Sequence, residues 1–162
     1  MNPINPPILT ALAARSVAAE PIKHLERNKE LESELVLVVI DYLQLMDGPN
    51  SESRDEELSK VVIQSKEIAK VLQVPVIVLS QLNRAIEHRR NKRPMLSDIR
   101  ETQSLESHAD VVTMIYRDEY YHPETEDQGV RKLITFKHSI GPDDIVKVLF
   151  EHQFTRYRNL AA

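Results

Sequence analysis

The sequence predicts an α/β fold in which helices flank a parallel β-sheet and a β-hairpin closes the chain. The main observation is three continuous apolar runs, since strands that are buried on both faces of a parallel sheet do not alternate apolar with polar residues. Helical patterns separate the first runs, which is typical of βαβ units. The length of 162 residues suits one domain.

The first elements follow an N-terminal part that differs from the rest. Residues 1–20 contain prolines and then an Ala-rich stretch that allows a short helix. Residues 22–33 follow Pro21 and predict a polar surface helix. The run LVLVVI at 35–40 predicts the first buried strand, which ends at Asp41.

The second half of the chain supplies the other strands. An apolar stripe at helical spacing predicts a helix over 58–72, after an acidic loop. Pro94 and Ser97 predict a short helix start, with Ser97 as the N-cap. The remaining expected strands are 76–80, 109–116, and a hairpin of 130–137 and 145–151 around Gly141.

Composition narrows the possible functions. The chain carries 21 Lys and Arg against 25 Asp and Glu, so nucleic acid contact would need a local basic patch. Cysteine is absent, which excludes disulfides, thiolate metal sites and cysteine nucleophiles. No apolar run approaches the roughly 20 residues of a membrane span. We therefore expect a soluble protein of a bacterial cytoplasm or an organelle interior, without a membrane partner.

The three glycines exclude several phosphate and nucleophile motifs. They are Gly48, Gly129 and Gly141. A P-loop needs two glycines five residues apart followed by lysine, and a dinucleotide fingerprint needs three glycines within six residues. A nucleophile elbow needs two glycines that flank a serine. None of these motifs fits the three positions.

Two strand ends carry candidate catalytic side chains. Asp41 ends a hydrophobic strand, as a Walker B carboxylate does when it holds Mg²⁺ on a nucleotide. The alternative is a helix cap or turn residue. Gln81 follows the next strand and has an amide that can contact a γ-phosphate or a water molecule. The alternative for Gln81 is a polar strand terminus.

One basic segment stands out in the acidic chain. Residues 84–100 hold six Lys and Arg against two acids, and they include Arg89, Arg90 and Arg100. Such a segment can contact phosphates, but it fits equally well a solvated loop or an interface with an acidic surface. The six histidines show no metal-ligand spacing, so Asp41 is the single candidate metal ligand.

Four motifs in order resemble the C-terminal ATPase domain of the DnaB-type replicative DNA helicases. They are VVIDYLQLM at 38–46, VPVIVLSQLNRAIEHRRNKRPMLSDIRET at 74–102, HADVVTMIYRDEYY at 108–121 and FTRYRNL at 154–160. The resemblance divides the chain into an unmatched extension, 1–20, and a partial RecA-like helicase ATPase domain, 21–162.

The resemblance implies a chemistry for the matched residues. Members form rings on single-stranded DNA, bind ATP with Mg²⁺ between subunits and unwind duplex DNA. By motif, Asp41 is then the Walker B carboxylate and metal ligand, Gln81 the γ-phosphate sensor, and Lys137 a nucleotide-binding residue. Arg100, Glu101 and Gln103 match the loop that faces DNA.

The sequence also departs from the family pattern. The family hairpin reads Lys-x-Arg-Asn-Gly, whereas this chain has Ser139 in place of the arginine that reaches the neighbouring subunit's ATP. The family's DNA loop ends in glycine, where this chain has Gln103. The family's P-loop and catalytic glutamate precede the part represented here. We therefore expect no tight ATP binding and no hydrolysis by this chain alone.

The missing P-loop strand predicts a gap in the sheet between the strands at 76–80 and 109–116. Residues 8–19 can cover it, the sheet can close, or another chain can supply a strand. Two functions fit: part of a helicase that needs a homo-oligomer or a subunit with the P-loop half, or a non-catalytic regulatory or single-stranded-DNA-binding subunit. A gene remnant without function is a further alternative.

Overall fold

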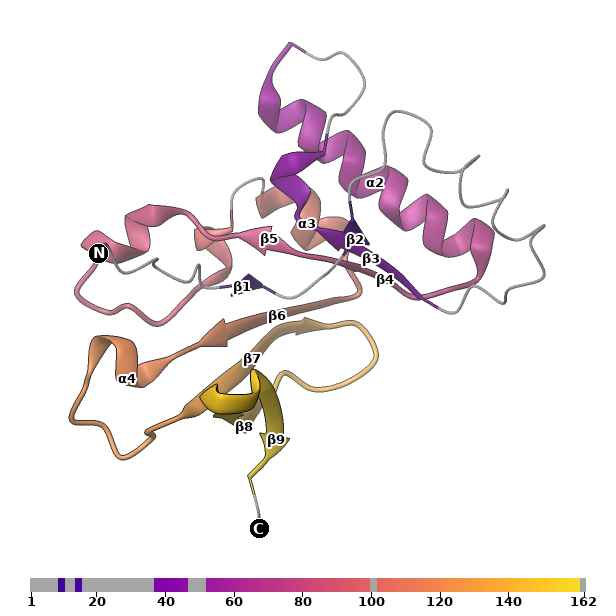
Figure 1. The fold of residues 1–162 in the computed structure, drawn as a ribbon. Coiled ribbons are helices and arrows are strands. Elements are labelled where there is room, and N and C mark those ends of the chain that lie inside the picture. The colour runs from indigo at the N-terminus through magenta and orange to yellow at the C-terminus, as the bar shows by residue number, and fades with distance from the viewer. Residues whose placement is uncertain (1–8, 11–13, 16–36, 47–51, 100–101, 161–162) are drawn as a thin grey trace.

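The computed structural model describes residues 9–10, 14–15, 37–46, 52–99 and 102–160 (Figure 1). The strands are β1 (Leu9–Thr10), β2 (Ala14–Arg15), β3 (Val38–Asp41), β4 (Val76–Val78), β5 (Ser80–Gln81), β6 (Val111–Tyr116), β7 (Val130–His138), β8 (Ile145–Glu151) and β9 (Arg156–Asn159). The helices are α2 (Arg54–Leu72), α3 (Thr102–His108) and α4 (Asp118–Tyr121). Short 3₁₀ turns are η1 (Leu43–Leu45), η2 (Arg84–His88), η3 (Leu96–Asp98) and η4 (His152–Phe154).

The strands form a parallel and an antiparallel ladder. The order β2-β3-β4 is parallel throughout, and the order β5-β1-β6-β7-β8-β9 is antiparallel. Only Leu79 separates β4 from β5, and its N–H donates to the Ile40 carbonyl at 2.8 Å. The predicted parallel sheet and hairpin are confirmed, and the antiparallel part is larger than the sequence predicted.

Helix α2 supplies the main apolar layer. Ser53 caps it, because its hydroxyl accepts from the Glu56 N–H at 3.2 Å. The helix begins before the apolar stripe because an acidic first turn suits the positive end of the helix dipole. Its buried face packs on β4, η1 and α3, and it shares one core with residues of β3 and β6; each fully buried aliphatic side chain contributes roughly 1.5–3 kcal/mol. This core contains Ile40, Leu58, Val61, Val62, Val78, Val112 and Met114.

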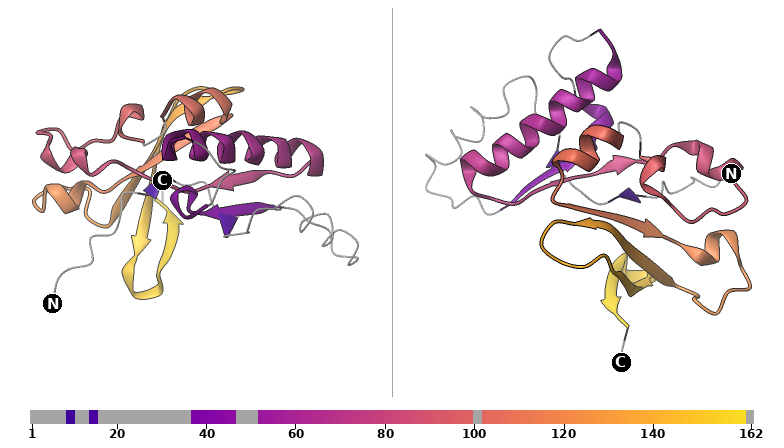
Figure 2. Two further views of the ribbon diagram at one scale, coloured as in Figure 1. Left: turned by 90° about the horizontal axis from the view of Figure 1, so that it is seen from above. Right: turned by 180° about the vertical axis from the view of Figure 1, so that it is seen from behind.

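Helices cover one face of the sheet. Figure 2 shows α2 and α3 on one side and the β8–β9 hairpin projecting on the other. Along β3, Ile40 points to the helices and is 4% exposed, whereas Val39 points away and is 40% exposed. The expectation that the first strand is buried on both faces is wrong, because no helix of the described residues packs on the second face.

Strand β1 occupies the gap that the sequence predicts. Thr10 pairs with Ser80 on β5 and with Met114 on β6, while Leu9 pairs with Gln81. The first of the three expected solutions, cover from within residues 8–19, is therefore the one observed. Strand β1 runs antiparallel to both neighbours, so β5 and β6 point in the same direction although no parallel ladder joins them directly.

Other expectations are corrected or fall outside the described residues. Ser97 is not an N-cap, because it lies inside η3, where Asp98 accepts instead from the Met95 N–H at 2.7 Å. The predicted helix at 22–33 lies outside the described residues, as do Arg100 and Glu101.

Candidate functional site

Asp41 and Gln81 lie on the same face of the sheet. Asp41 ends β3, is exposed and alternates with Ile40, so it shares the side of Val39. Ser80 is 2% exposed and points to the helix side, which turns its neighbour Gln81 to the opposite side. Both side chains therefore stand on the face that no helix of the described residues covers, where the two strands end. In open α/β sheets this edge is where ligands bind.

A residue that sequence reasoning missed fixes this edge. The Gln44 amide nitrogen donates to the Ser80 hydroxyl at 3.0 Å, and the Gln81 N–H donates to the Gln44 amide oxygen at 3.3 Å. Gln44 therefore joins η1 to β5 and holds the backbone that presents Gln81. The available signal was a polar residue between Leu43 and Leu45 directly after the Asp41 strand.

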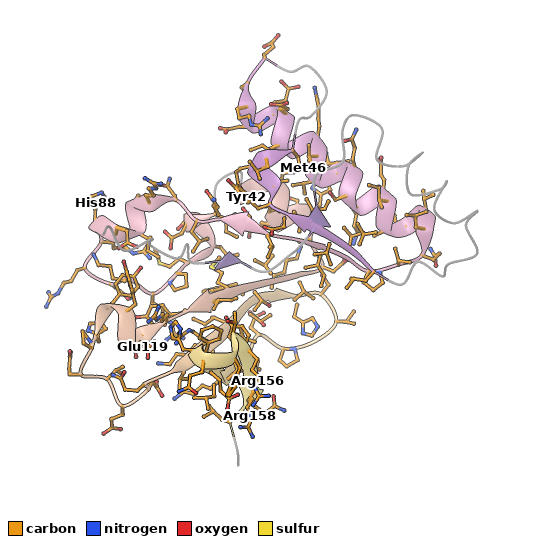
Figure 3. All side chains as sticks on the ribbon, viewed as in Figure 1. Tyr42, Met46, His88, Glu119, Arg156 and Arg158 are labelled. Atoms are coloured by element: carbon orange, nitrogen blue, oxygen red, sulfur yellow. The ribbon has the colours of Figure 1, made fainter. Side chains whose placement is uncertain are left out.

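Arg54 holds the segment that follows Asp41. Its guanidinium donates to the carbonyls of Gln44 at 3.0 Å and Met46 at 2.9 Å, and it pairs with Glu57. Figure 3 shows Met46 and Tyr42 beside α2, where this segment turns away from the sheet. The anchoring makes the end of β3 a defined structural position rather than a free loop.

The described side chains can supply one ligand to Mg²⁺, the Asp41 carboxylate, but they do not form a complete metal site. Among the described residues, no group of three His, Cys, Asp or Glu side chains could hold a metal ion. Asp41 contributes one carboxylate, and Mg²⁺ commonly takes one or two protein carboxylates together with phosphate oxygens and water. The arrangement therefore fits a metal that arrives with a phosphate ligand.

Lys137 caps a helix instead of standing free. Its ammonium group donates to the Glu106 carbonyl at 2.5 Å, in the last turn of α3. The turn after it is tied back, because the Ser139 N–H donates to the Asp110 carbonyl at 2.9 Å. A Cβ on Gly141 would lie 2.4 Å from the His138 ring, so the turn requires glycine unless that ring moves.

Arg89 makes the internal contacts that hold the basic segment, residues 84–100, together. It donates to both carboxylate oxygens of Asp98 at 2.8 and 2.9 Å, and to the carbonyls of Asn91 and Arg93 at 2.7 Å each. The Asp98 side chain is only 9% exposed, so this bidentate pair is largely shielded from water. The structure thus uses Arg89 as an internal clamp.

The other residues that the sequence predicts to contact DNA differ from Arg89 in exposure and ion pairing. Arg90 and Arg84 are exposed on the same segment, and the described residues supply no ion-pair partner for Arg90. Gln103 belongs to α3, at the start of that helix. The structure therefore leaves Arg90 as the exposed cation among the described DNA-binding candidates.

A charge network joins α4 to the hairpin. Lys132 pairs with Asp118 at 3.1 Å and with Asp127 at 2.6 Å, and Arg131 pairs with Glu119 at 3.0 Å. Burial opposes ionisation of Asp118, but hydrogen bonds from Lys132 and Tyr116 outweigh it and lower its pKa. The pKa of Lys132 is raised, and the main cause is its hydrogen bond with Asp127. These contacts are structural and fix the shape of the loop.

The aromatic residues of this region pack together. The rings of Tyr116 and Tyr121 stack at 6.1 Å, and Tyr120 meets Tyr121 edge-on at 4.9 Å. Burial raises the pKa of Tyr121, and its hydroxyl donates to Glu87 at 2.8 Å. Between base stacking and packing at a strand end, the contacts favour packing.

The sequence matches the family described as "DnaB-like helicase C terminal domain" over residues 9–159. It is 44% identical over 136 residues to "Replicative DNA helicase DnaC" of Bacillus subtilis, covering 83% of this chain and 30% of that protein. It is 41% identical over 147 residues to "Replicative DNA helicase DnaB" of Geobacillus stearothermophilus, covering 90% and 32%. The chain thus spans about a third of the length of these curated relatives. The expected boundary at residue 20 stays a prediction.

Solved structures give the same result. A solved structure of an ATPase domain superposes with a TM-score of 0.80 at 38% identity, covering 86% of this chain and 50% of that one. We call it the solved ATPase domain. A DnaB-like replicative helicase, studied with its interactions with primase, gives the same score and identity but is covered over 34% of its chain. The fold is therefore that of a truncated RecA-like domain.

Proposed function

Because this chain belongs to the DnaB-like helicase C-terminal domain family, we propose that it serves as one part of an ATP-dependent replicative DNA helicase. The observation that carries this proposal is the placement of Asp41 and Gln81 at nearby strand ends on the same face of the sheet. In this role Asp41 would contribute a carboxylate to Mg²⁺, and Gln81 would contact the γ-phosphate. The bound nucleotide supplies the phosphates and the metal.

The chain needs a complement for this function. Its three glycines cannot form a P-loop, and Ser139 offers no charge where an arginine finger would contribute about 10³–10⁵ in rate. We therefore propose that a homo-oligomer or a helicase subunit with the P-loop half completes the site, in a bacterial cytoplasm or an organelle interior. No helix of the described residues is long and apolar enough to cross a membrane.

The test is ATP hydrolysis by the purified chain, with and without single-stranded DNA. We expect no turnover above background from the chain alone, because the phosphate-binding loop is absent from its sequence. DNA-stimulated hydrolysis that Asp41→Ala abolishes would show that the chain needs no complement.

A second candidate is a non-catalytic subunit that binds single-stranded DNA. The observation that favours it is a basic segment whose shape Arg89 holds internally while Arg90 and Arg84 stay exposed. Phosphate contacts of this kind bind without reading sequence, as a protein that follows one strand requires. Lys137 and Gln103 remain proposed contacts of the nucleotide and the DNA, respectively.

Fluorescence anisotropy with a labelled oligothymidylate distinguishes this candidate. We expect salt-dependent binding that Arg90→Gln weakens, with the slope of log affinity against log salt smaller by about 0.7 for one lost phosphate contact. Lys70→Gln, which removes an exposed charge from α2, is the matched control. Equal effects of both variants would mean that net charge alone governs binding.

A further inference from the structure

Both acidic side chains of the basic segment are bound by other residues. Asp98 accepts from Arg89 in the internal clamp. Glu87, the second acid, lies in η2, and its carboxylate accepts from the Tyr121 hydroxyl at 2.8 Å. Tyr121 belongs to α4, and both views of Figure 2 show α4 and the turn that carries η2 at the same end of the molecule. The contact therefore joins the basic segment to an element that follows it by more than thirty residues.

The Tyr121 hydroxyl is held in place by the packing of its ring. The ring stacks on Tyr116 with 6.1 Å between centroids, and Tyr120 meets it edge-on at 4.9 Å. Tyr116 belongs to β6, is 5% exposed and donates its own hydroxyl to Asp118 at 3.1 Å. Burial, reinforced by the Glu87 carboxylate, raises the pKa of Tyr121, so the hydroxyl keeps its proton and can donate at neutral pH.

Without this contact, Glu87 would stand next to an exposed cation of its own turn. Side chains three residues apart eclipse in a 3₁₀ helix, so Arg84 and Glu87 share one face of η2. Opposite charges at this spacing attract each other. Within the described part of the chain, Arg84 and Arg90 are exposed and take part in no ion pair, and Glu87 is bound to Tyr121 instead. The hydroxyl thereby keeps the carboxylate from neutralising Arg84.

The backbone of η2 has supports other than Tyr121. Ile86 is 3% exposed and anchors η2 through its apolar side chain. The Arg89 N–H donates to the Ile86 carbonyl at 3.2 Å, and the Arg89 guanidinium is bound to Asp98. Loss of the Tyr121 hydroxyl should therefore release the Glu87 side chain while the turn keeps its shape.

We propose that Tyr121 is a positioning residue for the binding of single-stranded DNA, because by holding the Glu87 carboxylate it leaves Arg84 and Arg90 available to phosphates. The inference rests on the proposed single-stranded-DNA-binding function and identifies a side chain outside the basic segment that controls it. A cation contributes to such binding by neutralising a phosphate and releasing its counterions. A cation that is already paired with a carboxylate of its own chain cannot make this contribution in full.

The test replaces Tyr121 by phenylalanine, which removes the hydroxyl and keeps the ring packing. Fluorescence anisotropy with a labelled oligothymidylate should show an affinity at least about threefold lower, with a slope of log affinity against log salt smaller by about 0.7, since Glu87 then replaces one phosphate at Arg84. Tyr157→Phe is the matched control, because Tyr157 lies on β9 and is 53% exposed. It should change neither value.

A second substitution tests whether Tyr121 acts through Glu87. Glu87→Ala alone should bind at least as tightly as the wild-type chain, because it removes the carboxylate that competes with phosphate. Tyr121→Phe should have no further effect on affinity or salt slope when combined with Glu87→Ala. A role of Tyr121 in packing alone would give the same loss in both backgrounds.

The outcomes distinguish the role of Tyr121 from the DNA-binding function itself. An unchanged affinity for Tyr121→Phe, or an equal loss with and without Glu87, overturns the role of Tyr121 while DNA binding stands. A wild-type chain that does not bind the oligonucleotide contradicts the DNA-binding function, and the role of Tyr121 falls with it. If Tyr121→Phe does not fold by circular dichroism, Glu87→Ala decides, because weaker binding than wild type would overturn the proposal and equal or tighter binding would support it.

Discussion

Replacing Asp98 by alanine should destabilise the fold more than any other single change in the basic segment. The substitution removes both carboxylate contacts of Arg89 and the acceptor for the Met95 N–H. Arg89 would remain, 28% exposed and without its counter-charge. The segment would thus lose its clamp while keeping all of its positive charge.

The magnitude follows from the burial of the pair. Breaking a buried ion pair by removing one partner costs about 3–5 kcal/mol, and the partial exposure of Arg89 reduces this to about 3 kcal/mol. With a urea dependence of about 2 kcal/mol per molar, the unfolding midpoint should fall by about 1.5 M. Ellipticity of the helices, followed by circular dichroism, measures the midpoint.

Two further variants make this test specific. Glu67→Ala removes an exposed carboxylate from α2 and should change the midpoint little. Arg89→Ala combined with Asp98→Ala should cost less than the sum of the single changes, because the two residues share one interaction. A midpoint shift below about 0.5 M for Asp98→Ala would refute the clamp, and Arg89 would then be available for phosphate.

The remaining predictions concern pH, the hairpin turn and the edge of the sheet. The folded state lowers the pKa of Asp118, so the charged carboxylate stabilises the fold above the ordinary pKa of 3.8, and this stabilisation is lost as the pH falls below that value. In acid unfolding curves, Lys132→Met should therefore make the loss of stability at low pH smaller. Gly141→Ala should lower the melting temperature, and His138→Ala should restore most of it, because the atoms nearest to the added Cβ belong to the His138 ring. Gln44→Leu should cost about 1–3 kcal/mol in urea unfolding, because it removes the amide that donates to the buried Ser80 hydroxyl and accepts from the Gln81 N–H; an unchanged unfolding midpoint would refute this role of Gln44.

Local sequence patterns were sufficient where one physical rule dominates. The apolar stripe of α2 and the alternation in β7 and β8 each predict an element that the structure contains. The position of Asp41 at a strand end was predicted in the same way, since the apolar run stops there. Periodicity and strand ends are properties of a few neighbouring residues, which is why the sequence carries them directly.

Pairing between distant segments was not predictable in the same way. Gln44 is a single polar residue in the sequence, and its role emerges only when η1 meets β5. Arg89 belongs to a run of cations, and nothing local distinguishes it from Arg90. The difference arises because the chain returns at Asp98 with a carboxylate that is nearly buried.

Strand β3 shows how a correct pattern can support a wrong conclusion about burial. The run at 35–40 is apolar on both faces, as in a strand with helices on each side, yet Val39 is 40% exposed. Among the described residues no helix covers the Val39 side of β3, so the apolar pattern there predicts a packing contact that the described part of the chain does not make.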